Sequence, residues 1–148
     1  MSAPIRTLMF ASANDPVRSL KAIAIGASAV CLDLEDAVAT SEKAAAREVV
    51  TETLRDPSVE GANAHVRING VDTAFCDDDL TALGPSLSRL SGLLIPMVES
   101  ADQVRHVAAR LDALEAEHGI EAGSIRLIAI AETAKGVLAA PAVATSTP

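Results

Sequence analysis

Short apolar runs alternate along the chain with segments of helical periodicity, and the alternation occurs five times. Continuous apolar runs of this length are typical of parallel strands that are buried on both faces. The expected strands begin near Thr7, Ala29, Asn63, Gly92 and Ile125. Charged or polar residues follow the apolar runs. Because ligands of α/β proteins bind at the carboxyl ends of the strands, these residues are the candidates for a site.

Five helices are predicted after the strands. They run from Asp15-Pro16 to Gly26, Ser41 to Leu54, Asp77 to Leu83, Ser100 to His118, and Thr133 toward Ala144. Strand–helix units in series predict parallel strands with right-handed crossovers. The length of 148 residues alone favours a five-stranded open, doubly wound sheet. A (β/α)₈ TIM barrel needs about 250 residues.

Composition narrows the class of protein. Hydrophobic residues make up 49% of the chain and aromatic residues 1%, so Ala, Val, Leu and Ile must fill the core. The net charge of −8 argues against a nucleic-acid partner, which would need a basic face. Cys31 and Cys76 show neither disulfide nor metal-ligand spacing, which favours a reducing cytosol. With no signal peptide or membrane span in the sequence, we expect a cytoplasmic protein without a membrane partner.

The second expected strand ends in an acidic group, Asp33, Glu35 and Asp36. Alternation places Asp33 and Glu35 on the side opposite Leu32 and Leu34. Carboxylates this close repel one another unless hydrogen bonds, a cation or a helix N-terminus offset the repulsion. The group is either part of a site or an acidic turn that caps the second helix.

The third strand carries Arg67, with His65 and Asn69 predicted on the same face. An arginine in a buried strand needs a partner, because an unpaired buried charge is very costly. That partner is either a carboxylate at the same end of the sheet or the carboxylate or carbonyl of a substrate. His65 reads as a hydrogen-bonded core residue.

Glu132 follows the most apolar strand, and Glu99 follows the strand before it. A glutamate here suits a hard cation such as Mg²⁺, which takes one or two carboxylates and fills its other positions with water and ligand oxygens. The alternative is a glutamate in the first turn of a helix, where the helix dipole favours it. Glu99 has the same ambiguity, with Ser100 beside it as an N-cap.

Several segments resemble the citrate lyase β-subunit-like proteins of the HpcH/HpaI aldolase family. They are Thr7-Leu8-Met9-Phe10, Ala27 to Val38, Glu42 to Arg47, Val66-Arg67-Ile68-Asn69, Ile95 to Ser100, and Ile130 to Val137. Each string is weak alone, but their order and intervals across the whole chain are specific. The resemblance implies a TIM barrel, of which about five βα units are present, and reverses the preference for an open sheet. Residues 1–148 are then a single partial TIM-barrel domain, the N-terminal part of such a lyase.

The resemblance also implies roles for individual residues. Glu132 resembles the first Mg²⁺ ligand, and Arg67 the residue that binds a substrate carboxylate or thioester carbonyl. Glu35 and Asp36 line the same pocket as catalytic residues. Lys21 and Arg18 resemble basic positions that meet CoA phosphates, although a solvated helix face explains them equally well. The implied reaction cleaves a citryl-, malyl- or citramalyl-CoA type ester to acetyl-CoA and an oxo acid.

The chain departs from the family pattern in three places. Met97 stands where the family usually has a lysine, and Ala11-Ser12-Ala13 replaces the usual Pro-Gly. No residue matches the second metal-binding aspartate, which follows a sixth strand in the family. We therefore expect open sheet edges and association into a homo-oligomer.

Three other functions, one enzymatic and two non-enzymatic, are alternatives to the lyase. A pyruvate-type aldolase of the same family commonly has a histidine beside the acidic group, where this chain has Ala37. A truncated lyase that binds a ligand or partner without turnover is the non-enzymatic alternative. A receiver module would need an aspartate at the end of the third strand, which has Arg67-Ile68-Asn69 instead.

Overall fold

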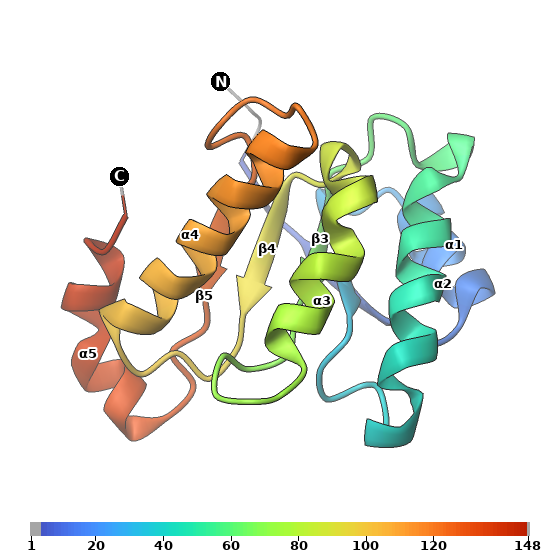
Figure 1. Ribbon diagram of the computed structural model, residues 1–148. Helices are drawn as coiled ribbons and strands as arrows, with labels where there is room; N and C mark the ends of the chain where they lie inside the picture. Colours follow the sequence, from blue (N-terminus) through green and yellow to red (C-terminus); the bar gives the residue numbers. More distant parts are fainter. Residues whose placement is uncertain (1–3, 148) are drawn as a thin grey trace.

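The computed structural model describes residues 4–147, in which five strands and five α-helices alternate (Figure 1). Residues 1–3 and 148, the ends of the predicted domain, lie outside the described residues. The strands are β1 (Leu8–Ser12), β2 (Ala29–Asp33), β3 (Ala64–Arg67), β4 (Gly92–Ile95) and β5 (Arg126–Ala129). The helices are α1 (Pro16–Ala24), α2 (Lys43–Arg55), α3 (Cys76–Leu83), α4 (Ala101–Glu117) and α5 (Ala134–Ala144). Short 3₁₀ turns lie at Thr40–Glu42, Pro57–Val59 and Gly84–Arg89.

The five strands form one parallel sheet in the order β1-β2-β3-β4-β5. Consecutive helices pack against one another, α1 on α2, α2 on α3, α3 on α4 and α4 on α5. The chain therefore winds in one direction and keeps its helices in one layer, as in a (β/α)₈ barrel. A doubly wound sheet would reverse its strand order at a switch point. The prediction of five βα units of a TIM barrel is confirmed, and the sheet remains open at β1 and β5.

The hydrophobic core lies between the sheet and the helices, and small side chains fill it. Its strand residues include Val30, Leu32, Val66, Leu93 and Ile95, and its helix residues include Ala46, Val50, Val107 and Leu111. Alternate strand residues face the other side of the sheet. Asp33 and Arg67 are register partners on that side. The alternation of side chains along the strands therefore places Asp33 and Arg67 on the face of the sheet that lies inside a complete barrel.

Helix caps account for most of the predicted helix boundaries. Asp15 accepts a hydrogen bond from the Arg18 N–H at the start of α1. Ser100 and Gln103 form a capping box at the start of α4. Thr133, rather than Glu132, caps α5, which leaves the carboxylate of Glu132 outside the helix cap.

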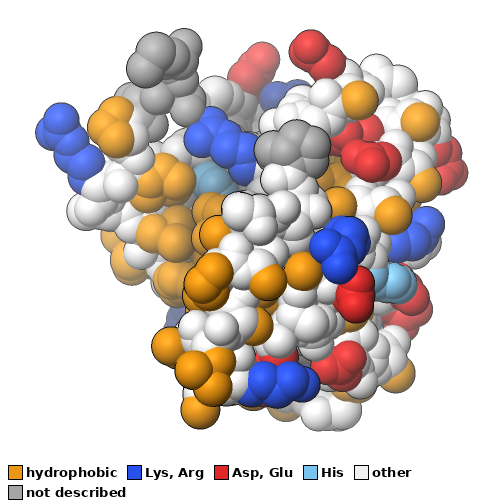
Figure 2. Space-filling model, turned by 90° about the vertical axis from the view of Figure 1, so that its left-hand side faces the viewer, with side chains coloured by type: hydrophobic (Ala, Val, Ile, Leu, Met, Phe, Trp, Pro, Cys, Tyr) orange, Lys and Arg blue, Asp and Glu red, His pale blue; other side chains and the backbone are white. Residues whose placement is uncertain are grey.

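Most of the exposed large hydrophobic side chains lie near the two edges of the sheet, beside β1 and β5. Near β1 and α1 they are Ile5, Met9, Phe10, Val17 and Ile25, and on α5 they are Val137 and Leu138; Met97, in the loop after β4, is the other exposed one among the described residues. Figure 2 shows hydrophobic side chains on the face that α5 occupies. The open edges and these side chains are where further protein would pack most favourably. None of the helices within residues 4–147 is both long and apolar enough to cross a membrane.

Candidate functional site

The guanidinium of Arg67 is held in a clamp of carboxylates at the carboxyl end of β3. Its Nε donates to Asp33 Oδ1 at 2.8 Å and its NH2 to Asp33 Oδ2 at 2.6 Å. NH1 lies 2.7 Å from Glu35 Oε2 and 3.6 Å from Asp36 Oδ2. The side chain of Arg67 is only 12% exposed, so these ion pairs are largely shielded from water. Of the two partners that the sequence left open, the structure shows the carboxylates of the chain itself.

Asp33 is the centre of this clamp because both of its oxygens are also bound by the loop that follows β2. Oδ1 accepts the Glu35 N–H at 2.9 Å and Oδ2 the Ala37 N–H at 3.2 Å. Hydrogen bonding to Asp33 raises the pKa of Arg67 above its ordinary value, against the opposing effect of burial. The Arg67 guanidinium also lies 5.4 Å from the centre of the Phe10 ring on β1, a cation–π contact. Arg67 therefore has a fixed position and stays charged.

Glu35 differs from Asp33 in its electrostatics. Burial raises the pKa of Glu35, and the nearby charge of Arg67 lowers it by less. Its buried Oε2 lies close to Arg67 NH1 but makes no hydrogen bond of good geometry within the described residues. Asp33 takes the directed hydrogen bonds of the guanidinium, and Glu35 is left to pair with it by charge alone.

The raised pKa of Glu35 predicts a pH dependence of stability. A carboxyl group whose pKa is raised by folding stabilises the folded state below its ordinary pKa of 4.5, and this contribution is lost as pH rises through the raised pKa. We expect the free energy of unfolding of the wild type to fall relative to that of Glu35→Gln as pH rises from the ordinary pKa of 4.5 through the raised pKa. Urea unfolding of both proteins across this range measures the difference. A difference that stays constant, or changes in favour of the wild type as pH rises, would contradict this assignment.

Glu132 lies at the same end of the sheet as Arg67, after β5 rather than β3. Its Oε1 accepts the backbone N–H of Met97 at 2.9 Å, which leaves Oε2 without a hydrogen-bond partner in the described part of the chain. Met97 has a φ of 53°, in the left-handed region that non-glycine residues rarely adopt. This conformation is a local strain of the kind found at functional sites.

Near Glu132, hydrogen bonds connect the loop that follows β4 to the start of α5. Glu99 accepts hydrogen bonds from Thr133 Oγ1 at 2.8 Å and from Lys135 Nζ at 3.1 Å, and these lower the pKa of Glu99. Gly136 packs so closely that a Cβ there would lie 2.3 Å from Val98 O. Glu99 thus contacts α5, although Ser100 next to it caps α4 as expected.

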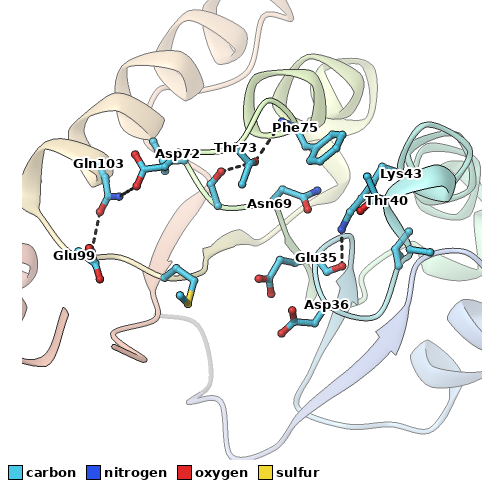
Figure 3. A pocket seen from close by; sticks show the side chains of 15 residues that line it. Glu35, Asp36, Thr40, Lys43, Asn69, Asp72, Thr73, Phe75, Glu99 and Gln103 are labelled. Carbon is cyan, nitrogen blue, oxygen red and sulfur yellow. Dashed lines mark hydrogen bonds between the residues drawn. The ribbon is translucent and has the colours of Figure 1, made fainter. Parts of the chain in front are cut away.

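A cavity of about 580 Å³ opens at the carboxyl ends of β2, β3 and β4 (Figure 3). Its lining includes Glu35, Asp36, Asn69, Phe75, Met97 and Gln103. Arg67 and Glu132 lie next to this lining and are not part of it. Glu35 and Asp36 pair with Arg67, and Met97 donates its N–H to Glu132. Arg67 and Glu132 therefore lie at one end of the sheet, on either side of β4, and no contact between them is present in the described residues.

Two further groups of predicted residues lie elsewhere. Arg18 is 77% exposed and pairs with Asp15 on α1, and Lys21 is also on the surface of α1, so neither contacts the Arg67 clamp. The prediction that Asn69 shares a face with Arg67 is wrong, because β3 ends at Arg67 and Asn69 binds Asp79 on α3. His65 is 2% exposed, and burial lowers its pKa, as expected of a neutral core histidine.

A polar cluster of Lys43, Arg47 and Asp79 has no role among the predictions from the sequence; Lys43 and Asp79 are buried, and Arg47 is partly buried. A signal was available, because positions 43, 46, 47, 50 and 54 form one helical stripe. Two basic residues in an otherwise apolar stripe indicate buried cations with specific partners.

The donors present fit a magnesium ion only in part. Within residues 4–147, no group of three or more His, Cys, Asp or Glu side chains is placed to hold a metal. Mg²⁺ does not need such a group, since one or two carboxylates with water and substrate oxygens are sufficient. The free Oε2 of Glu132 is an oxygen donor of the right kind, so Glu132 fits as one ligand of Mg²⁺.

The one-directional βα winding and the polar carboxyl end of the sheet define a TIM-barrel-type protein. The chain belongs to the HpcH/HpaI aldolase/citrate lyase family, whose model matches residues 6–148. It is 34% identical to the citrate lyase subunit beta of Leuconostoc mesenteroides subsp. cremoris, over 94% of this chain and 45% of that protein. It is 30% identical to the mitochondrial citramalyl-CoA lyase of Homo sapiens, over 91% of this chain and 39% of that protein. The chain spans about half the length or less of these relatives.

Solved structures show the same relationship. A citrate lyase beta subunit from M. tuberculosis, complexed with oxaloacetate and magnesium, superposes with a TM-score of 0.71. It is 35% identical in sequence, over 95% of this chain and 53% of that one. A second M. tuberculosis structure, which holds magnesium, acetoacetate and coenzyme A, has a TM-score of 0.71 and 35% identity over 95% of this chain and 45% of that one. The resemblance found in the sequence motifs is confirmed.

Proposed function

We propose that the protein is a Mg²⁺-dependent carbon–carbon lyase that cleaves a CoA ester of the citryl, malyl or citramalyl type to acetyl-CoA and an oxo acid. The observation that carries the proposal is the fixed, shielded guanidinium of Arg67 at the same end of the sheet as Glu132. Membership of the family and the CoA-ester lyases among the relatives support this reaction class.

Arg67 would bind the substrate carboxylate or thioester carbonyl. A guanidinium has five N–H donors, and Asp33 takes two of them. N–H groups on the two terminal nitrogens remain for substrate oxygens. Because the carboxylate clamp fixes Arg67 in advance, the guanidinium needs little reorganisation to stabilise negative charge on the thioester side.

Glu132 would hold the metal through Oε2, with its other oxygen kept in place by the Met97 N–H. When bound, Mg²⁺ supplies Lewis-acid polarisation of the oxo group of the substrate. Glu35 and Asp36 would line the pocket and order waters there. Lys21 and Arg18 on α1, which are free of the clamp, would meet the phosphates of CoA.

The test is the Glu132→Gln substitution, made in the full-length protein that the gene encodes. We expect Mg²⁺ affinity, measured by calorimetry, to fall at least about tenfold, because the substitution removes a charged metal ligand. Release of acetyl-CoA should fall with it. Glu117→Gln, the same substitution at an exposed position near the end of α4, is the matched control. Unchanged Mg²⁺ affinity and turnover in Glu132→Gln would contradict the assignment, and release of pyruvate in place of acetyl-CoA would favour the aldolase.

We further propose a cytoplasmic homo-oligomer that binds small molecules rather than nucleic acid. Both cysteines are free and buried, which suits a reducing compartment. The exposed hydrophobic side chains at the two ends of the sheet would be covered on association. Sedimentation at several protein concentrations tests the oligomeric state.

A further inference from the structure

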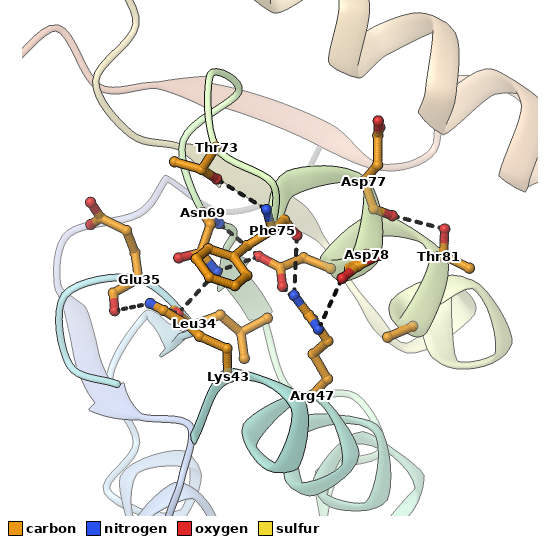
Figure 4. Close-up of polar contacts among 12 residues, drawn as sticks. Leu34, Glu35, Lys43, Arg47, Asn69, Thr73, Phe75, Asp77, Asp78 and Thr81 are labelled. Carbon is orange, nitrogen blue, oxygen red and sulfur yellow. Dashed lines mark hydrogen bonds and ion pairs between the residues drawn. The ribbon is translucent and has the colours of Figure 1, made fainter. Parts of the chain in front are cut away.

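Helix α2 carries two basic side chains one turn apart: Lys43, which is buried, and Arg47, whose side chain is 12% exposed. Lys43 points to the loop after β2, and Arg47 points to the start of α3 (Figure 4). The same side of the helix packs Ala46 and Val50 into the core. The family resemblance includes the segment that contains them, but the proposed reaction gives neither residue a role. Since burying a cation is costly, their partners show what the buried charge achieves.

Lys43 is 7% exposed, and its Nζ donates to two successive backbone carbonyls, Leu34 O at 2.7 Å and Glu35 O at 2.6 Å. No ion pair with a carboxylate is recorded for it within residues 4–147. These carbonyls lie on either side of the Glu35 α-carbon. A single ammonium therefore fixes the backbone on both sides of Glu35.

The Leu34 carbonyl also accepts a hydrogen bond from a second group of residues. Asn69 Nδ2 donates to Leu34 O at 3.1 Å and to Asp79 Oδ2 at 2.6 Å. Asp79, which is completely buried, also accepts the Asn69 N–H at 2.8 Å and Arg47 Nε at 2.7 Å. Because Arg47 lies on α2 and Asp79 on α3, this network connects the loop after β2 to both helices.

We propose that Lys43 is a positioning residue for the Arg67 clamp, and that its buried ammonium holds the loop so that the carboxylate of Glu35 stays against Arg67. The inference rests on the proposed function only in that the clamp is taken as a substrate site. The network fixes the main chain of Glu35, and Glu35 in turn contacts NH1 of Arg67 at 2.7 Å. The Leu34 carbonyl is bound by Asn69, which is held in place by Asp79 on α3 and, through Asp79, by Arg47 on α2.

The test is the titration midpoint of Glu35, followed by carboxyl ¹³C NMR in Lys43→Met. If Lys43 holds Glu35 in its buried place, the midpoint moves down toward the ordinary glutamate value when the loop is released. Loss of a nearby positive charge without movement would raise the midpoint instead. Lys43→Arg, which keeps a cation within reach of the carbonyls, should retain most of the wild-type midpoint.

Val50→Ala is the matched control, because it removes buried volume from the same helix without touching the network. It should lower the melting temperature and leave the Glu35 midpoint unchanged. An unchanged or raised midpoint in Lys43→Met, or the same downward shift in Val50→Ala, would overturn the proposal.

A measurement on the wild type covers the case in which Lys43→Met does not fold. The ammonium protons of Lys43 should exchange slowly enough to be observed by ¹⁵N NMR, whereas those of exposed Lys21 exchange fast. Equally fast exchange at both lysines would overturn the proposal. Neither readout requires turnover, so failure of the lyase assay and failure of the positioning role are distinguishable.

Discussion

Arg67→Met is expected to lower the free energy of unfolding by about 3–5 kcal/mol, the usual cost of removing one partner from a buried ion pair. Asp33 is 3% exposed and would lose its cationic partner, although the N–H groups of Glu35 and Ala37 would still bind it. Glu35, at 17% side-chain exposure, loses the same partner. Urea unfolding at neutral pH measures the change.

Two variants separate the buried clamp from a general effect of removing arginine. Arg105→Met breaks an exposed pair with Asp102, so it should cost less than about 1 kcal/mol. Arg67→Lys keeps a charge but cannot form the two parallel bonds to Asp33, and should fall between the other two. A loss in Arg67→Met no larger than in Arg105→Met would show that the clamp does not stabilise the fold.

Gly136→Ala is expected to cost about 1–3 kcal/mol, as overpacking does, although alanine usually stabilises a helix. The new Cβ would lie 2.3 Å from Val98 O and 3.2 Å from Thr133 Oγ1. The backbone oxygen cannot move out of the way alone, so the loop after β4 and the start of α5 must separate. The Met97 N–H then loses its place on Glu132, and Mg²⁺ affinity should fall as well.

Gly70→Ala is the matched control, because its Cβ would meet only Thr73 Cγ2, at an ordinary 3.7 Å. Thermal unfolding and Mg²⁺ calorimetry of both variants give the comparison. A Gly136→Ala protein that melts and binds Mg²⁺ as Gly70→Ala does would contradict the close packing around Glu132.

The positions of the elements could be predicted because their signals are local. Three expected strand starts, Thr7, Asn63 and Ile125, each lie one residue before the observed strand. Asp15 and Ser100 cap helices as predicted, and the last helix begins next to Thr133 as expected. The choice between an open sheet and a barrel was not local. Periodicity does not encode which strands are neighbours, so length and motifs favoured different folds until the strand order was known.

The site was predicted in its residue types and only partly in its contacts. Alternation correctly placed Asp33 on the side opposite Leu32, although it left the partner of Arg67 open, and it failed at Asn69 because the strand ends first. The contacts of Lys43 and Asp79 join α2 to α3 across the loops, and single-strand patterns carry no information about them. The roles of Arg67, Glu35, Asp36, Glu132, Lys21 and Arg18 in the reaction remain predictions.

A cation held by Glu132 is expected to bind at the same end of the sheet as Arg67, within reach of a substrate that Arg67 holds. Mn²⁺ in place of Mg²⁺ tests it directly, because a bound paramagnetic ion broadens the NMR signals of nearby nuclei. We expect broadening of the Met97 amide signal and of the Arg67 Nε–H signal, none at the Nε–H of Arg105, and loss of the effect in Glu132→Gln. Broadening that spares Met97 and Arg67, or that persists unchanged in Glu132→Gln, would contradict it.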